Sequence, residues 1–282
     1  MNGTNRFRRT RVEQSRVSRL HGRAGPKGSL IRKPYLDFSL ELRTALFFVG
    51  IFIAVGVAYL GLGRSGAVSS GSDLGLILPF TLGFLAVCAV SSALAFLVTL
   101  RHKLLLVSLV SGAVTAAAIL AQLGTLEAAA KLVFATSTGL WIGLMLTSIS
   151  QVAIIAGLII VVDFYSVFLG PTKKIVESGG NLIDYFTINL PVFGAPAVSR
   201  VGVSDLIFFS LFMACTLTYR LRRTATALAM TASFAGTMIV GVSLDMGVPA
   251  LPLLSISFLL ANADLLYRRF LEEPDEHKRD RG

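Results

Sequence analysis

Eight runs of apolar residues, each close to the length that crosses a bilayer as a helix, dominate this sequence. A helix rises about 1.5 Å per residue, so about 20 apolar residues span a hydrocarbon core roughly 30 Å thick. Hydrophobic residues make up 54% of the chain and charged residues 15%, a balance unlike that of an ordinary soluble domain. We therefore predict an all-α membrane protein, a polytopic bundle of eight or nine transmembrane helices. The eight runs lie at about 43–63, 75–99, 104–123, 128–148, 150–169, 202–219, 224–244 and 249–267.

The predicted spans divide the chain into four parts. The predicted spans are rich in Gly, Ala, Ser and Thr, and such small residues let transmembrane helices pack closely. The weakest boundary is the short connection Thr147-Ser148-Ile149-Ser150. We predict a basic tail, N-terminal transmembrane helices, a transmembrane core that contains a long polar loop at 170–201, and a charged C-terminal tail, at 1–42, 43–149, 150–267 and 268–282.

The net charge of +10 is concentrated at the N-terminus, where residues 1–43 carry eleven Lys and Arg against three acids. This stretch has no apolar periodicity and no spacing of metal ligands. We predict a disordered cytoplasmic tail whose partner is the anionic lipid surface of the bilayer. Nucleic acid or a specific protein partner is the less favoured alternative.

The distribution of basic residues predicts the orientation of the chain. With eight alternating spans and a cytoplasmic N-terminus, 21 Lys and Arg fall on the inner side and five on the outer side. Lys and Arg are enriched in cytoplasmic loops, so both termini are predicted to be cytoplasmic. This orientation puts the loop 170–201 on the outer face, and we expect the protein in the plasma membrane.

Two aspartates lie inside apolar stretches on either side of that loop. Asp163 follows Ile159-Ile160-Val161-Val162, and Asp205 precedes Leu206-Ile207-Phe208-Phe209. A carboxylate is costly in hydrocarbon, so an intramembrane aspartate is a functional-site hypothesis by default. Two carboxyls held close together share one proton and can act as an acid and a base. The alternative is a proton or cation site in a transporter or channel.

A Pro-Ala-Leu-Pro segment, Pro249 to Pro252, opens the last predicted span. Two prolines remove backbone donors and favour extended residues, so we expect an extended edge that pairs with unfolded substrate. The alternative is that proline simply suits the first turn of a helix. In the same span we predict a helical i,i+4 ion pair of Asp264 with Arg268. Two isolated cysteines predict neither a disulfide nor a metal site, and no metal or other cofactor is expected.

In this order the three elements resemble the presenilin and signal peptide peptidase family of intramembrane aspartyl proteases. That family has a Tyr-Asp helix, a Gly-x-Gly-Asp helix after a long loop, and a Pro-Ala-Leu turn. The stretch Val162-Asp163 matches the first element apart from its tyrosine. Gly202-Val203-Ser204-Asp205 matches the second with serine for the second glycine, and Pro249-Ala250-Leu251 matches the third in full. The resemblance covers roughly residues 150–267.

The resemblance implies an endopeptidase that cleaves transmembrane segments of membrane proteins or signal peptides. Asp163 and Asp205 would be its catalytic pair, and Tyr165 could replace the missing motif tyrosine as a neighbour of the pair. The residues implied to position the substrate are Gly202, Ser204, Pro249, Ala250, Leu251 and Pro252. A catalytically weak homologue is an alternative, because the motif tyrosine and second glycine are absent. Prepilin peptidases, which lack the Pro-Ala-Leu turn, are the less favoured enzyme.

Overall fold

The computed structural model describes residues 73–168, 182–191, 198–244 and 248–279, together with isolated positions between 43 and 61. Most described residues are helical. Four helical segments are long and apolar enough to cross a membrane, which supports the predicted class of a helical membrane protein. They are Arg101–Leu120, Ile149–Ser166, Arg223–Gly241 and Ala250–Phe270. The total of eight or nine spans stays a prediction. The basic tail and much of the loop 170–201 lie outside the described residues.

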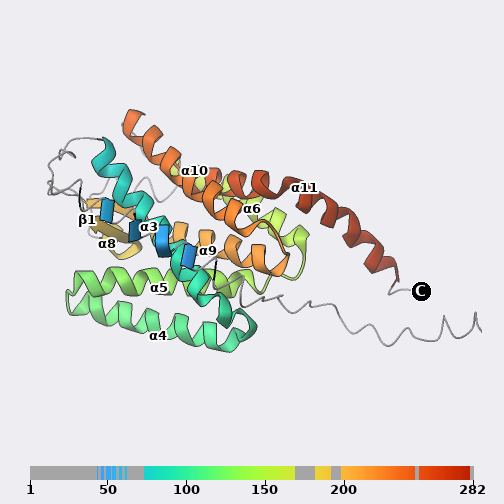
Figure 1. Cartoon of the computed structure of the whole chain (residues 1–282), viewed down its shortest axis with the longest axis horizontal. Coiled ribbons are helices and arrows are strands. Elements are labelled where there is room, and N and C mark those ends of the chain that lie inside the picture. The colour runs from blue at the N-terminus through green and yellow to red at the C-terminus, as the bar shows by residue number, and fades with distance from the viewer. Residues whose placement is uncertain are drawn as a thin grey trace, which may run out of the picture. The chain divides into compact units, whose positions relative to one another are not determined.

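The helices lie close to the predicted spans, with two differences (Figure 1). The last helix continues through most of the predicted charged tail, and the loop before Asp205 contains a short helix and a two-stranded sheet, so the prediction of an all-α chain is wrong there. The elements are α3 (Asp73–Leu94), η1 (Ala95–Thr99), α4 (Arg101–Leu120), α5 (Gly124–Gly143), α6 (Ile149–Phe168), α8 (Leu182–Phe186), β1 (Thr187–Pro191), β2 (Val198–Gly202), α9 (Val203–Thr218), α10 (Arg223–Leu244) and α11 (Ala250–Arg279).

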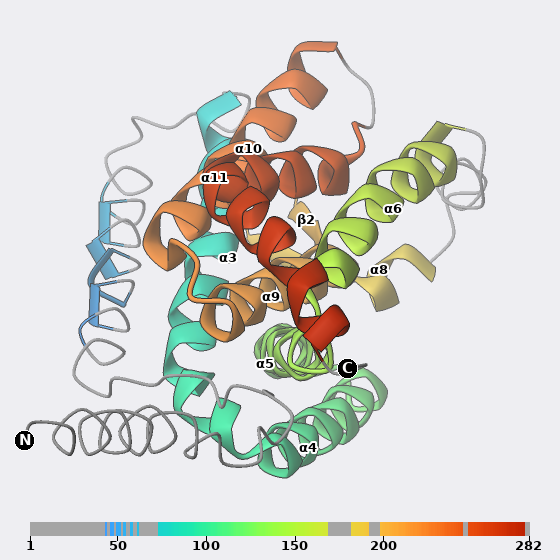
Figure 2. The ribbon, with the colours of Figure 1, turned by 90° about the vertical axis from the view of Figure 1, so that its right-hand side faces the viewer.

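The helix α5 lies between α4 and α9, and α11 packs against α6 and α10. Figure 2 shows α5 nearly end-on with α4 and α9 beside it. Aromatic rings join the other helices around α9. Phe84 of α3 stacks on Phe234 of α10 with ring centroids 3.7 Å apart, and Phe212 of α9 stacks on Phe258 of α11 at 4.4 Å. The core therefore surrounds α9, the helix that carries Asp205.

Two glycines one turn apart bring α5 into backbone contact with α9. A Cβ added at Gly143 would lie 2.6 Å from the carbonyl oxygen of Leu211, and one at Gly139 would overlap the carbonyl oxygen of Ile207. The sequence from Gly139 to Gly143 is a Gly-x-x-x-Gly pattern, which lets membrane helices approach at their backbones. At these two positions glycine allows the close helix packing that the sequence predicts.

The two strands form an antiparallel hairpin that leads directly into α9. Thr187 pairs with Gly202, and Ile188 pairs with Val201. Successive residues of a strand point to opposite faces, and here Ile188 and Val201 are buried together on one of them. The pairing therefore fixes the position of Gly202, three residues before Asp205.

The predicted boundary at Thr147–Ser150 contains the start of the helix α6 in the structure. The Ser148 hydroxyl accepts the backbone N–H of Gln151 at 3.2 Å, and the Gln151 side-chain oxygen accepts the N–H of Thr147 at 2.9 Å. Such reciprocal bonds satisfy donors that have no partner at a helix N-terminus. The prediction of a break between two helices at Thr147–Ser150 is confirmed.

The connection between α9 and α10 is held to α11 by a buried amide and an exposed ion pair. Asn262 accepts the N–H of Arg222 at 3.1 Å and donates to the Thr226 hydroxyl at 2.8 Å. Asp264 pairs with Arg222 at 2.8 Å instead of with Arg268, so the predicted ion pair within α11 is wrong. The i,i+4 rule treats a helix in isolation, and here the α9–α10 connection supplies a nearer cation.

Candidate functional site

Asp163 ends the buried stripe of α6. Val152, Ala156 and Ile159 are buried at helical spacing, and Asp163 follows four residues after Ile159. This spacing puts the carboxyl on the same side of the helix as the stripe. Asp163 is half-buried, and its Oδ2 accepts the backbone N–H of Leu251 at 3.2 Å. A residue of the Pro-Ala-Leu-Pro segment is therefore in direct contact with the first aspartate.

The prediction that the Pro-Ala-Leu-Pro segment is extended is wrong. The segment forms the start of a helix, because α11 begins at Ala250. The first four N–H groups of a helix have no acceptor within the helix, so proline at Pro252 loses no helical hydrogen bond. The alternative, proline in the first turn of a helix, is the one the structure has. The N–H of Leu251 is one such donor, and it is satisfied by Asp163.

Asp205 lies in the first turn of α9, close to the backbone of Gly202. Gly202 is the N-cap residue with φ −65° and ψ 133°, and its N–H donates to the Asp205 carboxyl. A Cβ added at Gly202 would lie 2.9 Å from Asp205 Oδ2. Gly202 is thus needed for the approach of this carboxyl, in addition to the substrate positioning that the resemblance implies for it. The N3 position of Asp205 matches the acidic half of a capping box.

The two aspartates are brought together from helices far apart in the sequence. Both are half-buried, and the charge of Asp163 acts on the Asp205 carboxyl. Each carboxyl also meets the N-terminus of a helix, where the helix dipole favours negative charge. Asp205 lies in the first turn of α9, and Asp163 of α6 accepts an N–H from the first turn of α11. Two carboxyls in such an arrangement can share a proton, with one ionised and the other protonated. This is the protonation pattern that general acid–base catalysis requires.

The other residues predicted at the site differ in how far they are buried. Pro249, Leu251 and Pro252 are buried, and Ala250 is half-buried beside them. Ser204 is exposed. Tyr165 is 61% exposed, and two residues along a helix turn through about 200°, so Tyr165 lies on a different side of α6 from Asp163. The structure therefore does not support Tyr165 as a neighbour of the pair.

Sequence reasoning missed one charged residue near the site. Lys131 lies in the predicted span 128–148 but was assigned no role there, although it is 3% exposed and pairs with Glu127 one turn before it. A lysine inside an apolar run, four residues after a glutamate, was the available signal. Cys88 and Cys215 are free and buried. In the part of the chain that the structure describes, no group of three or more His, Cys, Asp or Glu could hold a metal ion.

No family model, no curated protein and no solved structure matches this chain.

Proposed function

We propose that this chain is an intramembrane aspartyl endopeptidase, similar to presenilin and signal peptide peptidase, that hydrolyses peptide bonds within transmembrane segments or signal peptides. One observation carries the proposal. The charge of Asp163 acts on the Asp205 carboxyl, and Asp163 also accepts the N–H of Leu251, so residues of three motifs that lie apart in the sequence come near one another.

The proposed reaction uses the two carboxyls in different protonation states. The ionised carboxylate takes a proton from a water molecule as the oxygen attacks the peptide carbonyl carbon, and the protonated carboxyl donates a hydrogen bond to the carbonyl oxygen. A proton then passes to the leaving amine as the C–N bond breaks. The N–H groups of Leu251 and Gly202 orient the two carboxyls for these transfers. Effective catalysis depends on such orientation.

The membrane arrangement is part of the proposal. Eight spans with both termini in the cytoplasm would place the connection between α6 and α9 on the outer face of the plasma membrane. A water-filled crevice open to that face would admit water to carboxyls near the ends of their helices. The basic tail 1–42 would lie against anionic headgroups of the inner leaflet.

The deciding experiment compares Asp163→Asn, Asp205→Asn and the double variant with the native protein, purified in detergent with a single-span reporter substrate. We expect each single variant to abolish cleavage, and the double variant to be no worse, because the pair acts as a unit. Melting temperatures measured on the same samples separate chemistry from folding, because carboxylates that only capped helices would affect stability alone. Cleavage at the native rate by either single variant would refute the dyad.

A transporter that used the same aspartates predicts a different result. The native protein would leave the reporter intact, and the two substitutions would instead change proton or cation flux in reconstituted vesicles. Measuring both cleavage and flux on the same four proteins distinguishes the two functions.

A further inference from the structure

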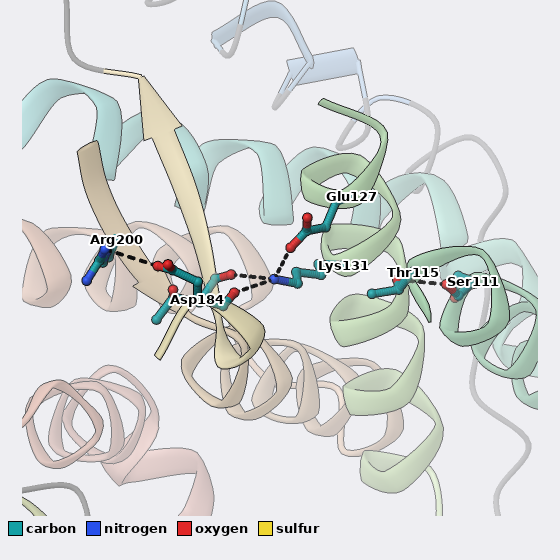
Figure 3. Close-up of polar contacts among 7 residues, drawn as sticks. Ser111, Thr115, Glu127, Lys131, Asp184 and Arg200 are labelled. Carbon is teal, nitrogen blue, oxygen red and sulfur yellow. Dashed lines mark hydrogen bonds and ion pairs between the residues drawn. The ribbon is translucent and has the colours of Figure 1, made fainter. Parts of the chain in front are cut away.

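A buried lysine outside the aspartate pair fixes the start of the hairpin. Lys131 of α5 donates from Nζ to the carbonyl oxygens of Asp184, at 2.7 Å, and Thr187, at 2.9 Å, and forms an ion pair with Glu127 at 2.5 Å (Figure 3). An ammonium group has three N–H donors, so these three acceptors satisfy it completely. Bonds of this kind, in which one partner is ionised, are roughly twice as strong as neutral ones.

The apolar contact between α5 and the hairpin is incomplete. A cavity of about 160 Å³ lies there, lined by residues of α3, α5, both strands and α9, among them Ala128, Leu132, Ile188, Val201 and Leu206. Side chains that border a void lose contacts on that side. Ile188 and Val201 are nevertheless buried in the core, and the bonds from Lys131 add a directional polar attachment of β1 to α5.

The attachment leads through the sheet to Asp205. Lys131 binds the carbonyl of Thr187, Thr187 pairs with Gly202, and Gly202 donates its N–H to the Asp205 carboxyl. The close fit of that carboxyl over Gly202 leaves little room for the strand to shift without moving the carboxyl as well.

We propose that Lys131 is a positioning residue for Asp205, acting through β1 and Gly202. Its ammonium sets where the hairpin meets α5, and the hairpin sets the orientation of the Asp205 carboxyl. The consequence for cleavage rests on the proposed protease function, whereas the consequence for the carboxyl itself does not.

The test uses the full chain in detergent and two measurements. The first is kcat and KM for the single-span reporter. The second is the pH titration of the infrared C=O band of the protonated Asp205 carboxyl, assigned by its loss in Asp205→Asn. Lys131→Met keeps the side-chain length and removes the charge and donors, and Lys131→Arg keeps the charge.

The matched control is Arg200→Ala. Arg200 pairs with the side chain of Asp184 at 3.0 Å on the exposed side of the same hairpin, whereas Lys131 binds the main chain of that residue. Exposed ion pairs contribute little, so Arg200→Ala should leave both measurements unchanged.

We expect Lys131→Met to lower kcat by about tenfold or more with KM nearly unchanged, because a misplacement of 1 Å can cost about a hundredfold in rate. In Lys131→Met the midpoint of the infrared titration of Asp205 should move by about half a pH unit or more. A shift of this size is what loss of the hydrogen bond from the Gly202 N–H to the Asp205 carboxyl predicts. Lys131→Arg should restore most of both. An unchanged midpoint and unchanged kcat in Lys131→Met, or equal effects in Arg200→Ala, would overturn the proposal.

Two further outcomes are also decisive. If Lys131→Met does not accumulate, Lys131→Gln retains an uncharged donor and should give intermediate values, whereas native values would overturn the proposal. If the native protein does not cleave the reporter, the protease function fails, and the infrared midpoint still decides whether Lys131 positions Asp205.

Discussion

Leu251 donates its backbone N–H to Asp163 Oδ2 at 3.2 Å, although 88 residues separate the two in sequence. The donor is a first-turn amide that α11 cannot use internally. The bond ties the Pro-Ala-Leu-Pro segment to the first aspartate through the main chain. Its strength therefore depends on the N–H group and on the position of the helix start, and less on the leucine side chain.

Removing that N–H should impair the site more than removing the side chain. Leu251→Pro deletes the donor in a helical turn that already contains Pro252, and Leu251→Ala keeps it while losing the same buried side chain. A hydrogen bond to a charged group is worth about 1.5–3 kcal/mol, so Leu251→Pro should cleave the reporter roughly ten- to a hundredfold more slowly than Leu251→Ala. Equal rates in the two variants would show that the bond does not matter for cleavage.

Gly202→Ala should displace the Asp205 carboxyl. The added Cβ would lie 2.9 Å from Oδ2, so the carboxyl must move. We expect cleavage to fall by about a hundredfold while the melting temperature stays near the native value. Gly157→Ala is the control, because a Cβ there meets nothing within 4 Å and a helical Gly→Ala change favours the helix. A parallel loss of activity in both variants would argue against the steric explanation.

The contact between α5 and α9 should be sensitive to a single methyl group. Gly139→Ala and Gly143→Ala each place a Cβ against α9 backbone, and overpacking of this kind costs about 1–3 kcal/mol. Gly236→Ala in α10 meets nothing within 4 Å and should be neutral or stabilising by up to about 1 kcal/mol. Denaturant unfolding in detergent measures all three. The interface described for α5 and α9 is wrong if all three variants are equally stable.

The two polar contacts that hold the α9–α10 connection should differ in strength. Asn262 is fully buried, and Asn262→Ala leaves the N–H of Arg222 without this acceptor, at a cost of about 1–3 kcal/mol. Asp264→Ala removes an ion pair whose side chains are about half exposed, which should cost under about 1 kcal/mol. Thermal unfolding of the two variants measures the difference. A larger loss in Asp264→Ala would reverse this assignment.

The proposed orientation can be tested at the two ends of α4. His102 and Gln122 are both exposed, one at each end of this helix. With Cys88 and Cys215 replaced by Ala, Gln122→Cys should react with a membrane-impermeant maleimide in intact cells, and His102→Cys should react only after lysis. The opposite pattern would invert the orientation, and labelling of both sites in intact cells would exclude α4 as a span.

The sequence alone determined the helical membrane class, the approximate helix positions and the two candidate aspartates. Apolar length and helical spacing are local properties, and a carboxyl in an apolar run stands out without knowledge of its neighbours. The break at Thr147–Ser150 was predictable for the same reason, since capping residues lie next to the donors they satisfy.

Only the tertiary structure decided how these residues meet. The helical start of α11, the use of Leu251 N–H by Asp163, and the attachment of β1 to Lys131 all join residues distant in the sequence. The same holds for Asp264 of α11, which pairs with Arg222 of the α9–α10 connection. Local pattern gives the donors and acceptors that a segment offers, but the partner that satisfies each buried group depends on which segment packs beside it.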